Sequence, residues 1–489
     1  MKETVNFIED GKAVSVSLES PGETLLDYLR LRKNKTGTKE GCCEGDCGAC
    51  TVVLAQSSEK GIEYVPVNAC IYLLGMMEGK EVITVEDIST EEAGLHPVQE
   101  AMVQCHGSQC GFCTPGIVMS LFAQYESKDT VDRETINNAL SGNLCRCTGY
   151  RPIIDAALQA DKNRHENQSC GAQNHEALLD HLNSNDSGQE ILCGNSDEFF
   201  ASPSNIDALL DLRAQHPDAT LIAGATDVGL WLTKKLANIR KIIWLGRVKE
   251  LLEIDDQADH LTLGAAVTYE KANDALTSIH PDIGTLLRRL GSKQIRSSGT
   301  VGGNIANGSP IGDMPPTLLA LGCDITLKSN SAERKMQLED FFIRYGQQDI
   351  ANDEVLSHVV IRKLQANDSF YCSKVSKRFD QDISSLLGAV RLTIEDEVIT
   401  DARIAFGGMA EIPKRAKNAE SFLIGTRIDN TEAQLAAVNA LADDFQPITD
   451  MRASKDYRMS SAKSILQKAF IKFGISEISN TSNFDLENV

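Results

Sequence analysis

Hydrophobic and polar positions alternate over short stretches in the first 90 residues, as they do in half-buried strands. Four such strands are predicted, at residues 5–8, 13–18, 51–54 and 82–85. The polar residues 9–12 predict a tight turn between the first two strands. Leucines with helical spacing predict one helix over residues 24–31. The start of the chain is therefore expected to be a small α+β module.

From about residue 96 the apolar positions recur at helical spacing instead. Thr114-Pro115 predicts a helix start, with Thr114 as the N-cap and Pro115 at the first helical position. A second helix is predicted to begin at Thr130 or Asp132 and to run through Leu140. We expect this part of the chain to form a small helical module.

The polar segment 161–190 is interpreted as a linker. After it, strand-like and helical patterns alternate, and a second mixed segment begins near Tyr371. A helix is expected at 432–442, and strands at 221–222, 241–245, 261–263, 389–394 and 402–406.

Length and charge restrict the classes of protein that fit. A chain of 489 residues is expected to hold several domains. The 48 basic and 69 acidic residues give a net charge of −21, which disfavours nucleic acid and anionic membranes as partners. The sequence has no apolar run of membrane-spanning length and no apolar signal core in its first ten residues. We therefore expect a cytoplasmic protein.

Ten of the 14 cysteines lie between residues 42 and 147. Cys42, Cys47 and Cys50 have C-x4-C-x2-C spacing, and Cys70 is a fourth candidate; this is the plant-type spacing of a [2Fe–2S] cluster. Neighbouring glycines let the backbone of such a loop come close to the cluster. A zinc knot usually uses two C-x2-C pairs, so the C-x4-C leg argues against it. Cys43 is surplus, because it would give C-x3-C instead.

A second group combines Cys110 and Cys113 in C-x2-C with Cys145 and Cys147 in C-x-C. Both pairs lie at predicted helix starts, where the helix dipole and free N–H groups favour thiolates. From spacing alone, a two-iron cluster, a zinc site and two unrelated pairs all remain open.

Glycine-rich segments at 220–227 and 299–304, followed by 309–313, form a third constellation. Such backbone can approach a pyrophosphate and present N–H donors to it. Glycine loops are more often simple turns, and the sequence contains neither G-x-G-x-x-G nor a P-loop. The segments alone therefore leave a nucleotide site and ordinary turns as alternatives.

The cysteine segments 41–50, 109–116 and 143–152 resemble the two iron–sulfur signatures of the xanthine oxidase family of molybdo-flavoenzymes. The Cys-Arg-Cys triplet followed by Thr-Gly-Tyr-Arg-Pro is highly specific to that family. The resemblance implies two [2Fe–2S] clusters, held by Cys42, Cys47, Cys50, Cys70, Cys110, Cys113, Cys145 and Cys147. The other cysteines, Cys105, Cys170, Cys193, Cys323 and Cys372, are expected to be small buried hydrophobic residues.

The resemblance also implies a multidomain α+β fold. Its parts are a β-grasp ferredoxin-like domain (1–87), a four-helix [2Fe–2S] domain (88–160), the linker (161–190), a vanillyl-alcohol-oxidase-like FAD domain (191–372) and an α+β C-terminal domain like that of CO dehydrogenase flavoproteins (373–489).

By the same resemblance, FAD would be held by Leu221, Ile222, Ala223, Gly224, Ala225, Thr226, Asp227, Leu290, Thr300, Val301, Gly302, Gly303, Asn304, Asp313, Leu356 and Lys374. Ala225 is a departure, because relatives often carry a polar residue there. Residues 374–382 resemble a charged stretch near the flavin in relatives; a solvated surface loop is the alternative.

The function implied is electron transfer, with no catalytic side chain on this chain. Electrons from a molybdenum centre would pass through the clusters and FAD to NAD during purine oxidation (hypoxanthine and xanthine to urate). The sequence to Val489 has no room for the family's molybdopterin module, so we expect that module on a large partner subunit, in a heterodimer paired into a heterotetramer. Alternatives are the equivalent subunit of an aldehyde, CO or nicotinate hydroxylase, and a stand-alone electron carrier.

Overall fold

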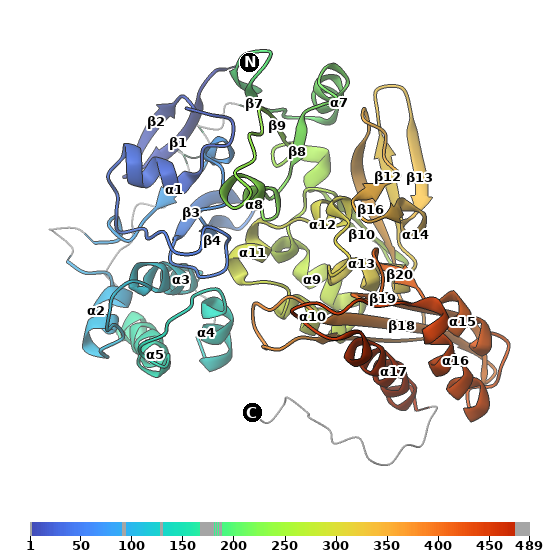
Figure 1. Cartoon of the computed structure of the whole chain (residues 1–489). Coiled ribbons are helices and arrows are strands. Elements are labelled where there is room, and N and C mark those ends of the chain that lie inside the picture. The colour runs from blue at the N-terminus through green and yellow to red at the C-terminus, as the bar shows by residue number, and fades with distance from the viewer. Residues whose placement is uncertain are drawn as a thin grey trace.

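The computed structural model describes residues 2–89, 94–127, 131–166 and 188–474, together with 180, 182 and 184. Four regions follow one another along the chain, each with its own sheet or helix group (Figure 1). The two N-terminal regions lie side by side, the third occupies the centre and the fourth packs at the far end. The architecture is multidomain α+β, as predicted.

The first region is a five-stranded sheet in the order β2-β1-β5-β3-β4, in which only β1 and β5 are parallel. This is the predicted β-grasp arrangement. The predicted helix is present over residues 25–32, but only α1 (Leu25–Asp27) is α-helical, and Tyr28–Arg32 form a π-helical turn. The strands are β1 (Val5–Glu9), β2 (Lys12–Val16), β3 (Thr51–Ser58), β4 (Gly61–Asn68) and β5 (Glu81–Ile83).

Four helices form the second region: α2 (Pro97–Gln104), α3 (Thr114–Glu126), α4 (Arg133–Leu140) and α5 (Arg151–Glu166). Asp132 caps α4 by accepting the Thr135 N–H at 2.8 Å, whereas Thr130 lies outside the described residues. The N-cap of α3 is Cys113, one residue before the predicted Thr114. The last turns of α5 enter the segment interpreted as a linker, most of which lies outside the described residues, as does Cys170.

The central region combines two sheets, with strand orders β6-β7-β9-β8 and β10-β11-β16-β12-β13, and a hairpin, β14-β15. Its helices are α7 (Ile206–Gln215), α8 (Val228–Thr233), α9 (Tyr269–Ile279), α10 (Pro281–Arg288), α11 (Lys293–Ser298), α12 (Val301–Asn307), α13 (Met314–Leu321) and α14 (Leu338–Phe341). Its strands are β6 (Ile191–Gly194), β7 (Phe199–Ser202), β8 (Thr220–Ile222), β9 (Lys241–Trp244), β10 (Ile254–Asp256), β11 (His260–Gly264), β12 (Asp324–Lys328), β13 (Glu333–Gln337), β14 (Phe342–Arg344), β15 (Gln347–Gln348) and β16 (Val355–Arg362).

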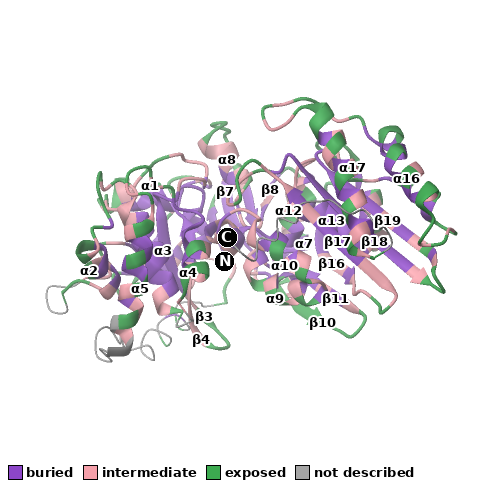
Figure 2. Ribbon diagram, turned by 90° about the horizontal axis from the view of Figure 1, so that it is seen from below, coloured by how far each residue is buried: buried purple, intermediate pink, exposed green. Residues whose placement is uncertain are grey.

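The fourth region is an antiparallel sheet, β17-β18-β19-β20, with three helices. Alternate residues of β18 point to opposite faces: Leu386 and Val390 join the core with α16 and α17, whereas Leu387 and Ala389 join the core of the central region. Both faces are therefore buried (Figure 2). The elements are β17 (Asp368–Val375), β18 (Leu386–Glu395), β19 (Val398–Gly407), β20 (Lys414–Arg415), α15 (Lys417–Leu423), α16 (Thr431–Asp444) and α17 (Lys455–Lys472).

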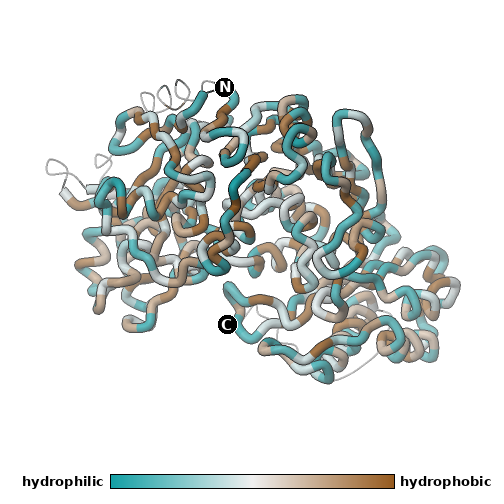
Figure 3. The backbone as a smooth tube through the Cα atoms, turned by 45° about the horizontal axis from the view of Figure 1, so that its top comes forward, coloured by the Kyte–Doolittle hydropathy of each residue, from teal (hydrophilic) through white to brown (hydrophobic). Residues whose placement is uncertain are grey.

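Hydrophobic segments recur along all four regions (Figure 3), and several clusters of buried apolar side chains extend from one region into the next. Within the part of the chain that the structure describes, no helix combines the length and apolar character needed to cross a bilayer.

Candidate functional site

The first candidate cluster centre is the loop of residues 41–50. The sulfur of Cys42 accepts three backbone N–H groups, from Glu44 and Asp46 at 3.4 Å and from Cys47 at 3.3 Å. The Cys42 N–H in turn donates to the Cys47 sulfur at 3.4 Å. The hydrogen bond from the Cys47 thiol, followed by these backbone donors, lowers the pKa of Cys42 to about 5. The loop therefore favours a thiolate.

Cys50 and Cys70 form a second pair beside the first. Both side chains are buried, and a hydrogen bond between their thiols, reinforced by burial, raises the pKa of Cys70. Cys70 also interacts electrostatically with Cys42, so the two pairs belong to one group. Two thiolate pairs fit a [2Fe–2S] cluster, in which each iron takes two cysteine ligands.

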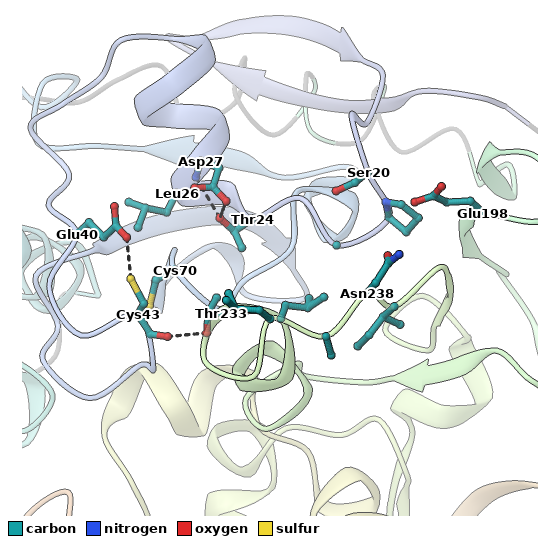
Figure 4. A pocket seen from close by; sticks show the side chains of 16 residues that line it. Ser20, Thr24, Leu26, Asp27, Glu40, Cys43, Cys70, Glu198, Thr233 and Asn238 are labelled. Atoms are coloured by element: carbon teal, nitrogen blue, oxygen red, sulfur yellow. Dashed lines mark hydrogen bonds between the residues drawn. The ribbon is translucent and has the colours of Figure 1, made fainter.

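Cys43 makes its hydrogen bonds outside this group. Its thiol donates to Glu40 at 2.9 Å, and its carbonyl oxygen accepts the Thr233 hydroxyl at 2.6 Å (Figure 4). Burial, followed by the hydrogen bond to Glu40, raises the pKa of Cys43 to about 12. A cavity of about 370 Å³ lies here between the first and central regions. Three carboxylates, Asp27, Glu40 and Glu198, line it.

The second candidate centre also contains two cysteine pairs. The thiol of Cys113 is hydrogen-bonded to that of Cys145, and the thiol of Cys147 to that of Cys110. Cys110 and Cys147 are exposed, whereas Cys113 and Cys145 are half-buried. These contacts join the start of α3 to the loop before α5.

The Thr-Gly-Tyr-Arg-Pro segment supports the Cys145 side of this centre. The Cys145 N–H donates to the Tyr150 hydroxyl at 2.8 Å, and that hydroxyl donates to the Asn143 carbonyl at 3.2 Å. Thr148 lies 3.2 Å from the Cys145 sulfur. Burial alone would raise the pKa of Cys145, but hydrogen bonds led by the one with Thr148 lower it overall.

The described residues contain no group of three or more His, Cys, Asp or Glu side chains gathered tightly enough to hold one metal ion. The cysteines are arranged in pairs. Two pairs at each centre match the ligand count of a [2Fe–2S] cluster, in which each iron takes two cysteines.

The two cysteine loops are in direct contact. The Leu144 N–H donates to the Cys47 carbonyl at 3.0 Å, and the Asn143 amide donates to the Gly48 carbonyl at 3.1 Å. A Cβ on Gly48 would lie 2.1 Å from the Gly142 oxygen, and one on Gly116 would lie 2.0 Å from the Gly48 oxygen. Only glycine permits this approach at both positions.

The candidate FAD site is a cavity of about 350 Å³ in the central region. The glycine-rich turn after β8 and the start of α12 form much of its wall. All but three of the sixteen predicted FAD residues line it: Leu221, Ile222, Ala223, Gly224, Ala225, Thr226, Asp227, Leu290, Thr300, Gly302, Gly303, Asn304 and Leu356. A glycine-backed, largely apolar cavity of this kind fits a flavin nucleotide.

Several features shape this cavity. Thr300 caps α12 by accepting the Gly303 N–H at 3.1 Å. Gly224 packs so closely on the Ser298 carbonyl that a Cβ would lie 1.8 Å from its oxygen. Ala225 has a left-handed backbone, with φ of 58°, which is unfavourable for a residue with a Cβ. Close packing of backbone on backbone at this wall thus leaves the cavity free for a ligand.

Lining residues that the sequence did not indicate include Trp231, Tyr269 and Ile295. The Tyr269 hydroxyl donates to Asn304 at 2.9 Å, which fixes the orientation of that amide. Trp231 and Tyr269 are aromatic residues inside ordinary helical patterns, so nothing in the sequence separates them from core residues.

The other three predicted FAD residues lie outside the cavity lining. Val301 is fully buried in the core of the central region. Asp313 and Lys374 form a buried ion pair at 2.7 Å, which joins the start of α13 to β17. Asp313 also accepts the Ser384 hydroxyl, and Lys374 donates to the Arg289 carbonyl at 2.9 Å.

Two short helices connect the FAD cavity to the first cysteine loop. On α8, Thr233 donates to the Cys43 carbonyl, and the adjacent Lys234 donates to the Cys42 carbonyl at 3.0 Å. On α11, Ile295 lines the cavity, and a Cβ on Gly45 would lie 3.2 Å from its Cδ1. The candidate cluster loop and the candidate flavin site are therefore neighbours.

Comparison with known proteins gives four family matches that together follow the four regions. Residues 7–74 match the 2Fe-2S iron-sulfur cluster binding domain, and residues 84–158 match a [2Fe-2S] binding domain. Residues 195–362 match the FAD binding domain in molybdopterin dehydrogenase. Residues 371–473 match the CO dehydrogenase flavoprotein C-terminal domain.

Similar proteins include xanthine dehydrogenase from Emericella nidulans, 31% identical over 91% of this chain and 36% of that protein. Xanthine dehydrogenase 1 from Arabidopsis thaliana is 33% identical over 82% of this chain and 34% of its own length. The structure of quinoline 2-oxidoreductase from Pseudomonas putida 86 is 26% identical, with a TM-score of 0.51 over 57% of this chain and 96% of that chain.

The chain belongs to the xanthine oxidase family of molybdo-flavoenzymes and carries its two [2Fe–2S] domains and its FAD-binding domain. Its matched domains are the iron–sulfur and FAD-binding domains that transfer electrons in that family. The chain spans about a third of the length of the curated relatives it matches.

Proposed function

We propose that this chain is the electron-transfer subunit of a xanthine dehydrogenase. In this proposal electrons come from a molybdopterin centre on a partner chain and leave to NAD, while hypoxanthine and xanthine are oxidised to urate. The observation that carries the proposal is the contact between the two cysteine groups at Leu144 and Cys47, beside the FAD cavity. The names of the similar full-length relatives support the choice of substrate.

The roles of the residues follow from this arrangement. The ferredoxin-like cluster would be held by Cys42, Cys47, Cys50 and Cys70, and the helical-domain cluster by Cys110, Cys113, Cys145 and Cys147. When bound, the clusters carry single electrons, and FAD converts between single electrons and the hydride exchanged with NAD. The chain itself binds these groups, excludes water from Cys50 and Cys70, and fixes the distances between the sites.

We propose the domain boundaries 1–87, 88–160, 191–372 and 373–489, with 161–190 between the second and third domains. The exposed thiols of Cys110 and Cys147 favour the helical domain as the side that faces the molybdopterin partner, because this candidate centre opens to the surface. We also propose a heterodimer with that partner, paired into a heterotetramer, in the cytoplasm.

A second candidate is the iron–sulfur/flavin component of another molybdenum hydroxylase. Structures of Cu,Mo-CO dehydrogenase and of quinoline 2-oxidoreductase resemble this chain at 25% and 26% identity, each with a TM-score of 0.51. Each match covers 57% of this chain or less, whereas the xanthine dehydrogenase relatives match it across both cluster domains and the flavin domain.

Purification of the native complex from its source tests the proposal. We expect a copurifying molybdopterin chain and NADH formation with hypoxanthine and xanthine. Preferential turnover of carbon monoxide, nicotinate, quinoline or an aldehyde would assign the chain to another hydroxylase. A chain that purifies alone, with clusters but without flavin, would instead be an electron carrier.

A further inference from the structure

One side chain of the central region reaches both cluster domains. Gln294, on α11, is 1% exposed. Its amide nitrogen lies 3.2 Å from the Thr51 hydroxyl, 3.1 Å from the Ser120 hydroxyl and 3.1 Å from the Asn143 amide oxygen. Thr51 belongs to the ferredoxin-like region and the other two to the helical region, so one amide group joins three regions. Figure 1 shows α11 next to the two cluster regions.

The partners of Gln294 are next to the cysteine ligands. Thr51 directly follows Cys50, and Asn143 precedes Cys145 by two residues. The Asn143 amide donates to the Gly48 carbonyl at 3.1 Å, so the group held by Gln294 is the one that joins the two cysteine loops. Ser120 donates to Asn143 at 2.7 Å and completes this network.

The same helix turn reaches the flavin site. Ile295, the next residue on α11, lines the FAD cavity and packs against the first cysteine loop at Gly45. A displacement of α11 would therefore change the position of all three cofactor sites at once.

The network is fully buried, which makes its geometry strict. Thr51, Ser120 and Asn143 are each 2% exposed or less. The Gln294 amide oxygen is buried without a hydrogen-bond partner among the described residues, which is an unfavourable arrangement. That oxygen faces Gly142, where a Cβ would lie only 2.1 Å from it. An apolar side chain would not bury an unpaired oxygen and would avoid this cost. We therefore attribute the role of Gln294 to its amide N–H donors, which fix one arrangement of Thr51, Ser120 and Asn143.

We propose that Gln294 is a positioning residue that sets the relation of the two [2Fe–2S] clusters to each other and to the flavin. The inference rests on the proposed function, because it assumes that both clusters and FAD are present. Gln294 contacts none of the candidate ligands and acts through Thr51 and Asn143.

The test compares three full-length chains loaded with iron–sulfur clusters and FAD: wild type, Gln294→Met and Asn138→Ala. Methionine keeps the approximate length and volume of glutamine but removes its donors. Asn138→Ala is the matched control, because it removes the 2.8 Å bond from Arg296 on the same helix to the helical domain without touching Asn143. Iron and flavin contents are measured first, to show that all three chains are loaded.

Two readouts then follow: the magnetic interaction between the reduced clusters in low-temperature EPR, and the rate of electron exchange between the clusters and flavin after flash photoreduction. We expect Gln294→Met to weaken the magnetic interaction and to slow exchange about tenfold, as the loss of supporting interactions around metal ligands typically does. Asn138→Ala should match wild type in both. Ser120→Ala, which removes one hydroxyl, should shift both readouts in the same direction by less, and it serves if Gln294→Met does not fold.

Unchanged readouts in Gln294→Met, or equal losses in Gln294→Met and Asn138→Ala, would overturn the positioning role. If Gln294→Met does not fold, unchanged readouts in Ser120→Ala would overturn it. A wild-type chain without two magnetically interacting clusters would refute the proposed function itself, a result distinct from these.

Discussion

The Leu144 N–H donates to the Cys47 carbonyl oxygen at 3.0 Å, so one hydrogen bond links the two candidate cluster loops. Leu144 directly precedes Cys145, and Cys47 belongs to the first group. The peptide groups of two candidate ligands are thus joined almost directly. Movement of either loop would therefore displace the other, so we expect the two candidate centres to behave as one rigid unit.

The first prediction separates Cys42 from its neighbour Cys43. Cys42→Ala should lose the ferredoxin-like cluster and about half of the bound iron, because that sulfur accepts three backbone N–H groups within the group of four. Cys43→Ala should keep all the iron, because its thiol is bonded to Glu40 instead. Iron and acid-labile sulfide analysis measures both variants. Full iron content in Cys42→Ala would transfer the ligand role to Cys43.

The second prediction concerns pH. Glu81, on β5, is buried, and burial raises its pKa to about 7 from the ordinary 4.5. The folded state therefore favours the protonated form, so the stability contribution is fully present below pH 4.5 and is lost as the pH rises through about 7. Its size is at most about 3 kcal/mol.

Urea denaturation of the first region from pH 5 to 8 measures this effect. Glu81→Gln should be more stable than wild type near pH 8 and should show a flatter pH dependence. Glu59→Gln, at an exposed turn, is the control and should follow wild type. Parallel pH profiles for wild type and Glu81→Gln would refute the assignment.

The third prediction tests the buried pair of Asp313 and Lys374. Asp313→Ala leaves the Lys374 ammonium group buried without its carboxylate, and we expect a loss of about 3–5 kcal/mol in the free energy of unfolding. The double variant Asp313→Leu/Lys374→Met should recover much of that loss, because it leaves no uncompensated charge. Denaturant titrations give both values. A double variant that is no more stable than Asp313→Ala would show that the pair is not coupled.

The fourth prediction concerns the strained wall of the FAD cavity. Asn tolerates the left-handed backbone of Ala225 better than Ala does and adds an amide to the cavity. Ala225→Asn should bind FAD about fivefold more tightly, the value of one hydrogen bond of about 1 kcal/mol. Ala225→Val, β-branched at a positive φ, should bind FAD more weakly. Equilibrium dialysis measures both, and tighter binding by Ala225→Val would contradict the account.

The parts of the candidate sites that could be predicted from the sequence are those that depend on the spacing of nearby residues. The cysteine pairs and the glycine-rich wall are short motifs, so their geometry is largely encoded by adjacent residues. Strands within β18 and β19 were also predicted. The π-helical turn over Tyr28–Arg32 was missed because its leucines have ordinary helical spacing. The continuation of α5 beyond residue 160 was missed because its polar residues look like loop residues.

Long-range relationships could not be read from the chain. Gln294 bonds to residues 151 to 243 positions away, and a lone glutamine in a short helix gives no sign of such partners. Asp313 and Lys374 were expected at the flavin, but they are paired with each other across 61 positions. Burial and pairing of this kind depend on how the regions pack.

The most direct test of the central claim is the content of iron, acid-labile sulfide, zinc and flavin per full-length chain, combined with EPR of the reduced protein. Two [2Fe–2S] clusters and one FAD predict about four irons, four sulfides and one flavin per chain, with two distinct EPR signals. Zinc in place of iron, cysteines paired as disulfides, or a single cluster signal would contradict it.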